Sequence, residues 1–415
     1  MQQPQPRNPD LPVPKFTSLL ALPDFRRVWL IGICSGIVRW LEMLAFGIYV
    51  FDLTGSAFLV ATFTLLRFIP FALFGAVTGA LVDKLGHRKV LRYSLMVMFA
   101  SSGILVWLTQ TGQLELWHLA IASALGGIYW TTDFPARRNL IGLLAGPSLL
   151  ARALSFDAAS NTLTRAIGPL IGGALMASLG ITGILMVTLG LYFIALLVVL
   201  RLSKPAPSGS AEAAGLFREI RDGFKFALTD RNLMAAYAIT VIFNLFGFPF
   251  TALIPVIGKE TLGLTPDAVG MIAALEGLGA VFGALAVGRM HLIRQIWTTY
   301  IGGVATCLIG IAVMGIGEHI LVVGSGIALA GFGAGLFAAS QVTLIYRLSP
   351  AEQRSRMLGV LTICIGTAPF GFALLGYMAD WLGSGHALLI MSIEGAVSLL
   401  LFWLIFRREV QSSVD

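Results

Sequence analysis

Twelve long apolar segments occupy most of this 415-residue chain and restrict what it can fold into. Each is long enough to cross about 30 Å of hydrocarbon as an α-helix that rises about 1.5 Å per residue. We therefore predict an all-α polytopic membrane protein with twelve transmembrane helices. The predicted segments are residues 28–51, 57–81, 90–110, 116–135, 155–178, 182–202, 233–257, 266–288, 297–317, 319–346, 357–381 and 385–406.

Composition and the placement of charge agree with a membrane protein. The chain is 57% hydrophobic and 12% charged, whereas soluble domains average about 25% charged residues. The net charge of +7 does not indicate a nucleic-acid partner, because all but four of the 28 Lys and Arg residues fall in the tails and in alternate loops. This asymmetry follows the positive-inside rule. Together with the even number of spans, it predicts a multi-pass membrane protein with both termini in the cytoplasm.

A longer connection divides the chain. Residues 203–214 are rich in Ser, Pro, Ala and Gly, which is typical of a flexible linker. After it, Leu216, Ile220, Phe224 and Leu228 recur at helical spacing, which predicts an amphipathic helix on the membrane surface. We predict an N-terminal six-helix bundle, a cytoplasmic linker with this helix, and a C-terminal six-helix bundle, at residues 1–202, 203–232 and 233–415.

The two bundles carry weak internal repeats. Gly75-Ala-Val-Thr-Gly-Ala-Leu81 matches Gly279-Ala-Val-Phe-Gly-Ala-Leu285. Two further pairs lie in corresponding helices at nearly the same offset, namely Pro169 with Pro369 and Gly127 with Gly335. Parallel repeats of this kind predict two pseudo-symmetric halves related by an axis along the membrane normal.

A short basic turn follows the second apolar segment and carries a recognisable pattern. The turn contains Gly79, Asp83, Gly86, His87 and Arg88. Together with twelve helices and a central linker, it resembles the major facilitator superfamily of secondary transporters, except that His87 replaces the usual Arg. The resemblance implies alternating access, in which two six-helix bundles rock about a central site. It also implies that no ATP is used.

Three further stretches resemble the branch of enterobactin- and macrolide-type exporters. They are residues 25–29 followed by 53–57, residues 133–138, and residues 165–173. In the family, the aspartate near the end of the second helix belongs to a charge network with the fourth helix. The resemblance therefore implies that Gly79, Asp83, Gly86, Arg88 and Asp133 gate the cytoplasmic side.

The fifth apolar segment contains a Gly-Pro pair and a Gly-Gly pair, at Gly168, Pro169, Gly172 and Gly173. This resembles the antiporter motif of proton-driven exporters, although Thr164 stands where that motif has glycine. The glycines permit close helix packing, and the proline bends the helix. Ordinary small-residue packing is the alternative interpretation.

Five charged residues lie deep inside apolar segments, and two of them are carboxylates. A charge near the bilayer centre costs at least about 2.5–3.5 kcal/mol on insertion scales, so it rarely faces lipid. Burial favours the protonated form of a carboxyl group, and a nearby arginine favours the ionised form. We predict Glu42 and Glu276 as candidates for proton coupling. The alternative is that they form permanent ion pairs with Arg39, Arg67 or Arg165.

The same arginines are candidates for substrate binding, because the guanidinium group suits bidentate capture of an anion. Their alternative role is to neutralise the two glutamates. Aromatic and amide side chains in the expected cavity helices are further candidates for substrate contacts, and interhelical hydrogen bonds are the alternative for the amides. The predicted substrate-binding residues are Arg39, Trp40, Arg67, Arg165, Asn244 and Gln341. Asp380 is interpreted as a solvated boundary residue.

We expect a secondary active transporter that exports hydrophobic or amphipathic small molecules, coupled to protons. The alternatives are a transporter for a specific anionic amphiphile, such as a siderophore or lysophospholipid, and a non-transporting receptor. No phosphate-binding loop, nucleophile elbow or metal-ligand spacing occurs, so we expect no enzyme, metal or cofactor. Three cysteines in separate segments do not form a metal-site pattern. The expected partners are a small-molecule substrate, protons and the lipid bilayer, and the expected oligomeric state is a monomer.

Overall fold

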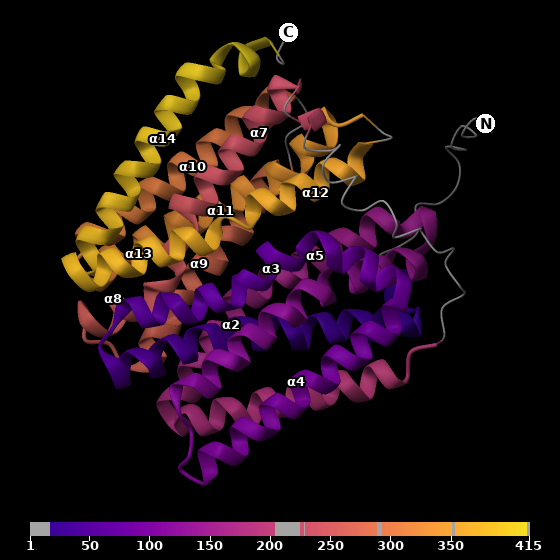
Figure 1. Cartoon of the computed structure of the whole chain (residues 1–415), viewed down its shortest axis with the longest axis vertical. Helices are drawn as coiled ribbons and strands as arrows, with labels where there is room; N and C mark the ends of the chain where they lie inside the picture. The colour runs from indigo at the N-terminus through magenta and orange to yellow at the C-terminus, as the bar shows by residue number, and fades with distance from the viewer. Residues whose placement is uncertain (1–16, 204–224, 228, 289–292, 351–352, 413–415) are drawn as a thin grey trace.

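The computed structural model describes residues 17–203, 225–227, 229–288, 293–350 and 353–412, and the part of the chain it describes folds as a bundle of long helices (Figure 1). The first half contains α1 (Thr17–Leu20), α2 (Pro23–Thr54), α3 (Ala57–Leu85), α4 (His87–Gln110) and α5 (Leu116–Leu200). The second half contains α7 (Arg231–Ile242), the π-helical turn η2 (Phe243–Gly247), the 3-10 turn η3 (Pro249–Ala252), α8 (Ile254–Glu260), α9 (Pro266–Val287), α10 (Ile293–Ile316), α11 (Ile320–Leu348), α12 (Arg354–Ile365), α13 (Ala368–Leu382) and α14 (Ser384–Ser412).

The long element α5 makes three passes. Gly146 and Gly180 have φ angles of 67° and 62° inside it, a left-handed conformation that glycine adopts readily, so the chain reverses at both. Ten helices in the described residues are long and apolar enough to span a membrane. This count takes residues 148–200 as a single span, although the chain reverses within it at Gly180, and it leaves out the first pass of α5, residues 116–145. With the reversals in α5 counted, the predicted twelve transmembrane helices are confirmed.

Two predicted segments are not continuous helices. Residues 233–257 were expected as one helix, but π and 3-10 turns interrupt it between α7 and α8, where Pro249 has no N–H to donate. The Phe248 N–H instead bonds the Phe243 carbonyl at 2.8 Å, the wide spacing of a π turn. Residues 357–381 likewise break at Gly366, just before Pro369, to give α12 and α13.

The predicted repeat has a direct structural counterpart. Gly127 in α5 packs against the Arg67 backbone of α3, and Gly335 in α11 packs against the Ala280 backbone of α9. A side chain at either glycine would collide with a carbonyl oxygen of the neighbouring helix. The fold therefore consists of two pseudo-symmetric six-helix halves, as expected. The predicted linker helix covers residues 216–228, of which 216–224 and 228 lie outside the described residues, so it stays a prediction.

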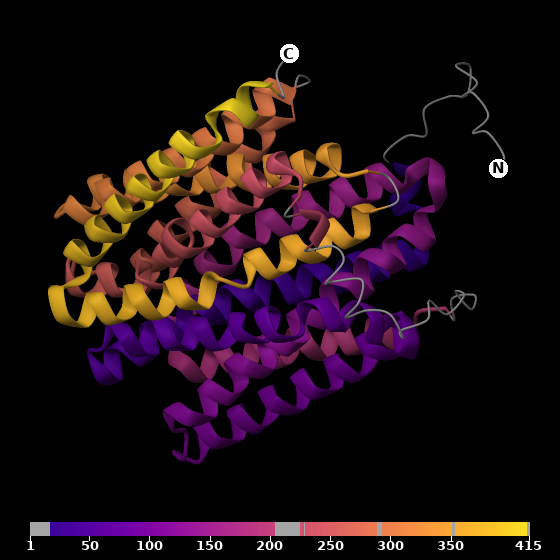
Figure 2. The ribbon, with the colours of Figure 1, turned by 45° about the horizontal axis from the view of Figure 1, so that its top comes forward.

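The start of α2 and the end of α14 lie at one end of the molecule, here called the terminal end (Figures 1 and 2). At the opposite, far end, the halves are joined by polar contacts. Asp380 of α13 accepts hydrogen bonds from the Ser56 hydroxyl at 2.7 Å and from the Phe58 N–H at 3.0 Å, at the start of α3. Lys259 pairs with Asp52 at 3.0 Å. Asp380 is exposed, which fits a solvated boundary residue, and it also bonds across the two halves, which the sequence did not predict.

Candidate functional site

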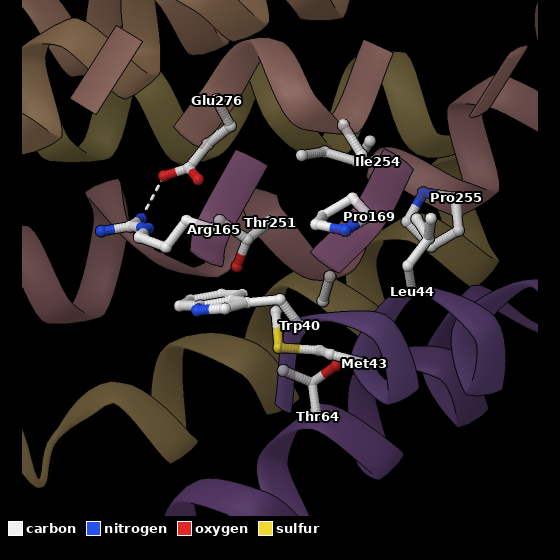
Figure 3. A pocket seen from close by; sticks show the side chains of 12 residues that line it. Trp40, Met43, Leu44, Thr64, Arg165, Pro169, Thr251, Ile254, Pro255 and Glu276 are labelled. Carbon is white, nitrogen blue, oxygen red and sulfur yellow. Dashed lines mark hydrogen bonds and ion pairs between the residues drawn. The ribbon is translucent and has the colours of Figure 1, made fainter. Parts of the chain in front are cut away.

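A pocket lies at mid-depth between the two halves, so that a rocking motion of the halves would change its shape (Figure 3). Helices α2, α3 and α5 line it from the first half, and η3, α8 and α9 line it from the second. Its residues are Trp40, Met43, Leu44, Thr64, Arg165, Pro169, Thr251, Ala252, Ile254, Pro255, Ala273 and Glu276.

An ion pair across this pocket connects the halves. Arg165 of α5 donates from Nη2 to Oε1 of Glu276 in α9. The Glu276 side chain is 5% exposed and the Arg165 side chain is 17% exposed. Gly277, next to Glu276, lets the α5 backbone approach, because a Cβ there would lie 2.8 Å from the Ala166 Cα. The sequence predicted both charged residues, and only the fold shows that they are partners from opposite halves.

Two hydrogen-bond donors at the pocket have no acceptor. The guanidinium carbon of Arg165 lies 5.0 Å from the Trp40 ring centroid, so the cation stacks on the indole. Among the described residues, neither Trp40 Nε1 nor Arg165 Nε has a hydrogen-bond partner. Figure 3 shows the indole nitrogen and the guanidinium group at the same end of the pocket. The pocket therefore presents unsatisfied donors.

A second ion pair lies wholly within the first half. Arg67 of α3 donates to Glu42 of α2 at 2.5 Å and to the Arg39 carbonyl at 2.8 Å. Gly126 in α5 makes room for the guanidinium, since a Cβ there would lie 3.1 Å from Arg67 Nη2. Both members of the pair are buried. Arg67 is thus occupied by Glu42, which matches the neutralising alternative for that arginine.

Arg39 differs from the other two arginines. It is 7% exposed, and its guanidinium carbon lies 4.2 Å from the ring centroid of Trp130 in α5. Within the described part of the chain, no carboxylate forms an ion pair with it. Helical spacing suggested that Arg39 and Glu42 share a face, but Glu42 instead turns to Arg67.

A further buried charge cluster was only partly anticipated. Arg137 of α5 pairs with Asp133 (Nε to Oδ2, 3.4 Å) and with Asp157. Tyr129 donates to Asp133 at 3.3 Å and shares a 2.6 Å hydrogen bond with Ser35 of α2. Sequence reasoning missed Arg137, although its spacing of four residues from Asp133 places both on one helical face.

The two predicted gate residues whose side chains are described, Arg88 and Asp133, do not contact each other. Arg88 is half-buried and donates to the Leu200 carbonyl at 3.1 Å, while Asp133 is buried beside Arg137. Gly86, with φ of 88°, makes the turn between α3 and α4, and Gly79 lies in α3. The Asp83 side chain lies outside the described part of the structure, so its role in the gate stays a prediction.

The two predicted amide contacts already have partners. Gln341 of α11 donates to the Thr240 hydroxyl at 3.2 Å, and Asn244 donates to the Thr240 carbonyl at 2.8 Å. The Thr240 hydroxyl also bonds that of Tyr300 at 2.7 Å. This buried network connects α7, α10 and α11, and Gln341 takes part in it as the interhelical alternative has it, whereas the Asn244 bond stays within its own helical segment.

The glycines of the fifth span separate into two groups by what they contact. A Cβ at Gly168 would lie 2.6 Å from the Trp40 Cβ, and one at Gly172 would lie 3.2 Å from the Leu41 carbonyl oxygen. These two pack α5 against α2. Gly173 instead faces the other half, where a Cβ would lie 2.7 Å from the Gly270 Cα. Pro169 lines the pocket. The motif therefore packs α5 against α2 of its own half and against α9 of the other half.

Comparisons with known proteins agree with this architecture. A family model described as Major Facilitator Superfamily matches residues 28–366 and 259–415. The staphyloferrin A transporter of Staphylococcus aureus is 22% identical over 377 residues, covering 89% of this chain and 93% of that protein. The multidrug efflux pump Tap of Mycolicibacterium fortuitum is 24% identical, with 87% and 90% covered. Among solved structures, a mutant of the peptide transporter POT has a TM-score of 0.75 at 12% identity, with 94% and 95% covered.

Proposed function

The chain belongs to the major facilitator superfamily, and from that premise we propose that it exports amphipathic small molecules in exchange for protons. It does so by alternating access in a bacterial cytoplasmic membrane, with both termini in the cytoplasm. The terminal end then faces the cytoplasm, and the far end faces outward. The similarity to Tap and to macrolide efflux protein A of Streptococcus pyogenes, which is 21% identical over 266 residues, supports export.

The observation that carries the proton coupling is the Arg165–Glu276 ion pair. Its members belong to opposite halves, so opening the far end separates α5 from α9 and removes the partner of Glu276. An isolated carboxylate in an apolar pocket favours its protonated form. Glu276 then takes a proton from outside. When the halves close again, Arg165 restores the ionised form and the proton leaves into the cytoplasm.

The other candidate carboxylate lacks this property. Glu42 and Arg67 both belong to the first half and move together as that half rocks. Rocking of the halves leaves their ion pair intact. We therefore assign the coupling proton to Glu276 and a structural role to Glu42.

The test is transport by purified protein in proteoliposomes, with erythromycin and ethidium as cationic probes and 2-naphthylacetate as an anionic probe. In wild type, an imposed pH gradient drives probe accumulation, and a probe gradient alone drives counterflow exchange. Glu276→Gln is expected to reduce the pH-driven accumulation at least about tenfold, because it removes one proton-transfer group. It is expected to retain counterflow, which does not need the proton. The readout is the ratio of the two rates.

Two matched variants control this test. Glu318→Gln changes an exposed carboxylate in the loop before α11 and should leave both rates unchanged. Glu42→Gln should lower both rates together, in proportion to the amount of folded protein. Full pH-driven accumulation by Glu276→Gln, or its selective loss in Glu42→Gln, would contradict the assignment.

A further inference from the structure

The centre of the molecule has a surplus of hydrogen-bond donors over acceptors. Among the described residues, each buried carboxylate near the middle of the first half or in α9 contacts an arginine. The contacts are Glu42 with Arg67, Asp133 and Asp157 with Arg137, and Glu276 with Arg165. Arg39 remains as a buried cation without an ion-pair partner in the described part of the chain; it lies over the face of Trp130, and Asp133 is near enough to act on it electrostatically. Such a charge is expensive to keep inside a membrane, and it is rarely retained without a function.

The unsatisfied polar atoms at the pocket between the halves have the same polarity as this cation. Trp40 Nε1 and Arg165 Nε, both at the pocket between the halves, are donors without acceptors. A ligand that complements this region must supply acceptor atoms. A cationic headgroup would add a charge of the same sign to Arg39 and would leave both donors unpaired.

An aromatic surface adjoins Arg39. Phe68 of α3 lies 5.1 Å from Trp130, 5.3 Å from Phe248 of the second half and 5.3 Å from Phe372 of α13, measured between ring centroids. The cluster therefore bridges the two halves at mid-depth. Trp130 and Phe248 are half-buried, so parts of both rings remain open to a ligand. Aromatic faces bind apolar ligand bodies, and the guanidinium supplies the polar end.

We propose that Arg39 and the half-buried rings of Trp130 and Phe248, supported from behind by Phe68 and Phe372, bind an anionic amphiphile, with its carboxylate, phosphate or sulfonate on Arg39 and its apolar body on the two open rings. The inference rests on the proposed function, and it specifies the charge of the substrate. An inside-negative membrane potential drives an anion outward and a proton inward, so it favours both movements of the proposed exchange.

The test uses three naphthalene probes that share one apolar body and differ in charge, with the purified full chain in lipid nanodiscs. The probes are 2-naphthylacetate, 2-naphthylacetamide and 2-(2-naphthyl)ethylammonium, and the readout is the dissociation constant from calorimetry. Wild type is expected to bind the acetate at least about tenfold more tightly than the amide, since a hydrogen bond to a charged group contributes about 1.5–3 kcal/mol. The ammonium probe is expected to bind most weakly.

Variants then test whether Arg39 sets this preference. Arg39→Gln should weaken acetate binding about tenfold or more and change amide binding by less than about twofold, because only the charged contact is lost. Arg39→Lys should recover part of the preference. The wild-type series alone decides the case if Arg39→Gln fails to fold. Equal affinity for all three probes, a preference for the ammonium probe, or no binding of any probe would overturn the proposal.

Failure of this inference and failure of proton exchange are distinguishable. Anion-selective binding that depends on Arg39, together with unchanged pH-driven transport in Glu276→Gln, would overturn only the proton assignment. Proton-driven transport that depends on Glu276, together with binding indifferent to ligand charge, would overturn only the anion subsite.

Discussion

Arg137→Met is expected to give the largest loss of stability in the first half. The substitution leaves Asp133 and Asp157 buried at about 1% and 3% exposure without their shared cation. Breaking a buried pair by removing one partner costs about 3–5 kcal/mol, because an uncompensated charge stays in an apolar interior. The readout is the apparent melting temperature in detergent, followed by fluorescence-detected size-exclusion chromatography.

The neighbouring arginine is a matched control for this effect. Arg138 is exposed and rests on the Phe134 ring at 4.1 Å, so Arg138→Met should change stability by about 1 kcal/mol or less. Adding Asp133→Asn and Asp157→Asn to Arg137→Met should restore most of the loss, because a neutral cluster of similar volume carries no unpaired charge. Equal melting temperatures for Arg137→Met and Arg138→Met would refute the structural role of the cluster.

Asp380→Ala is expected to shift the molecule toward an open far end. The carboxylate joins α13 to the first turn of α3 through two hydrogen bonds, at 2.7 and 3.0 Å, and only the closed arrangement contains them. Their loss should destabilise this arrangement by about 1–3 kcal/mol, roughly a 5- to 150-fold change in the equilibrium. Spin labels at Gln113→Cys and Glu318→Cys, both exposed at the far end of opposite halves, should then show a population at longer distance.

A contact of the same chemistry within one half controls for local damage. Glu260 accepts from the Ser384 hydroxyl at 2.7 Å, and both residues belong to the second half. Glu260→Ala removes a carboxylate–hydroxyl bond of equal length without touching the contact between the halves. It should leave the spin-label distances unchanged. A shift of similar size in both variants would show that Asp380 does not hold the far end closed.

Much of the architecture was predictable because a helix that crosses the hydrocarbon of a membrane needs an uninterrupted run of apolar residues, and such runs are visible in the sequence. The number of helices and the two-half repeat follow from runs of apolar residues and from matching glycines such as Gly127 and Gly335. The breaks beside Pro249 and Gly366 were missed, although the prolines nearby signal them. Apolar periodicity does not distinguish a continuous helix from one that π and 3-10 turns interrupt, because both bury the same residues.

The sequence by itself determined that the chain spans a membrane, how often it crosses, and which side chains carry charge within the apolar segments. Only the tertiary structure decided the partners of those charges. Glu42 and Glu276 look equivalent in sequence, yet one pairs with Arg67 of its own half and the other with Arg165 of the opposite half. The physical reason is that an ion pair depends on distances of a few ångströms between helices far apart in the chain, and helical spacing specifies only which residues share a face of one helix.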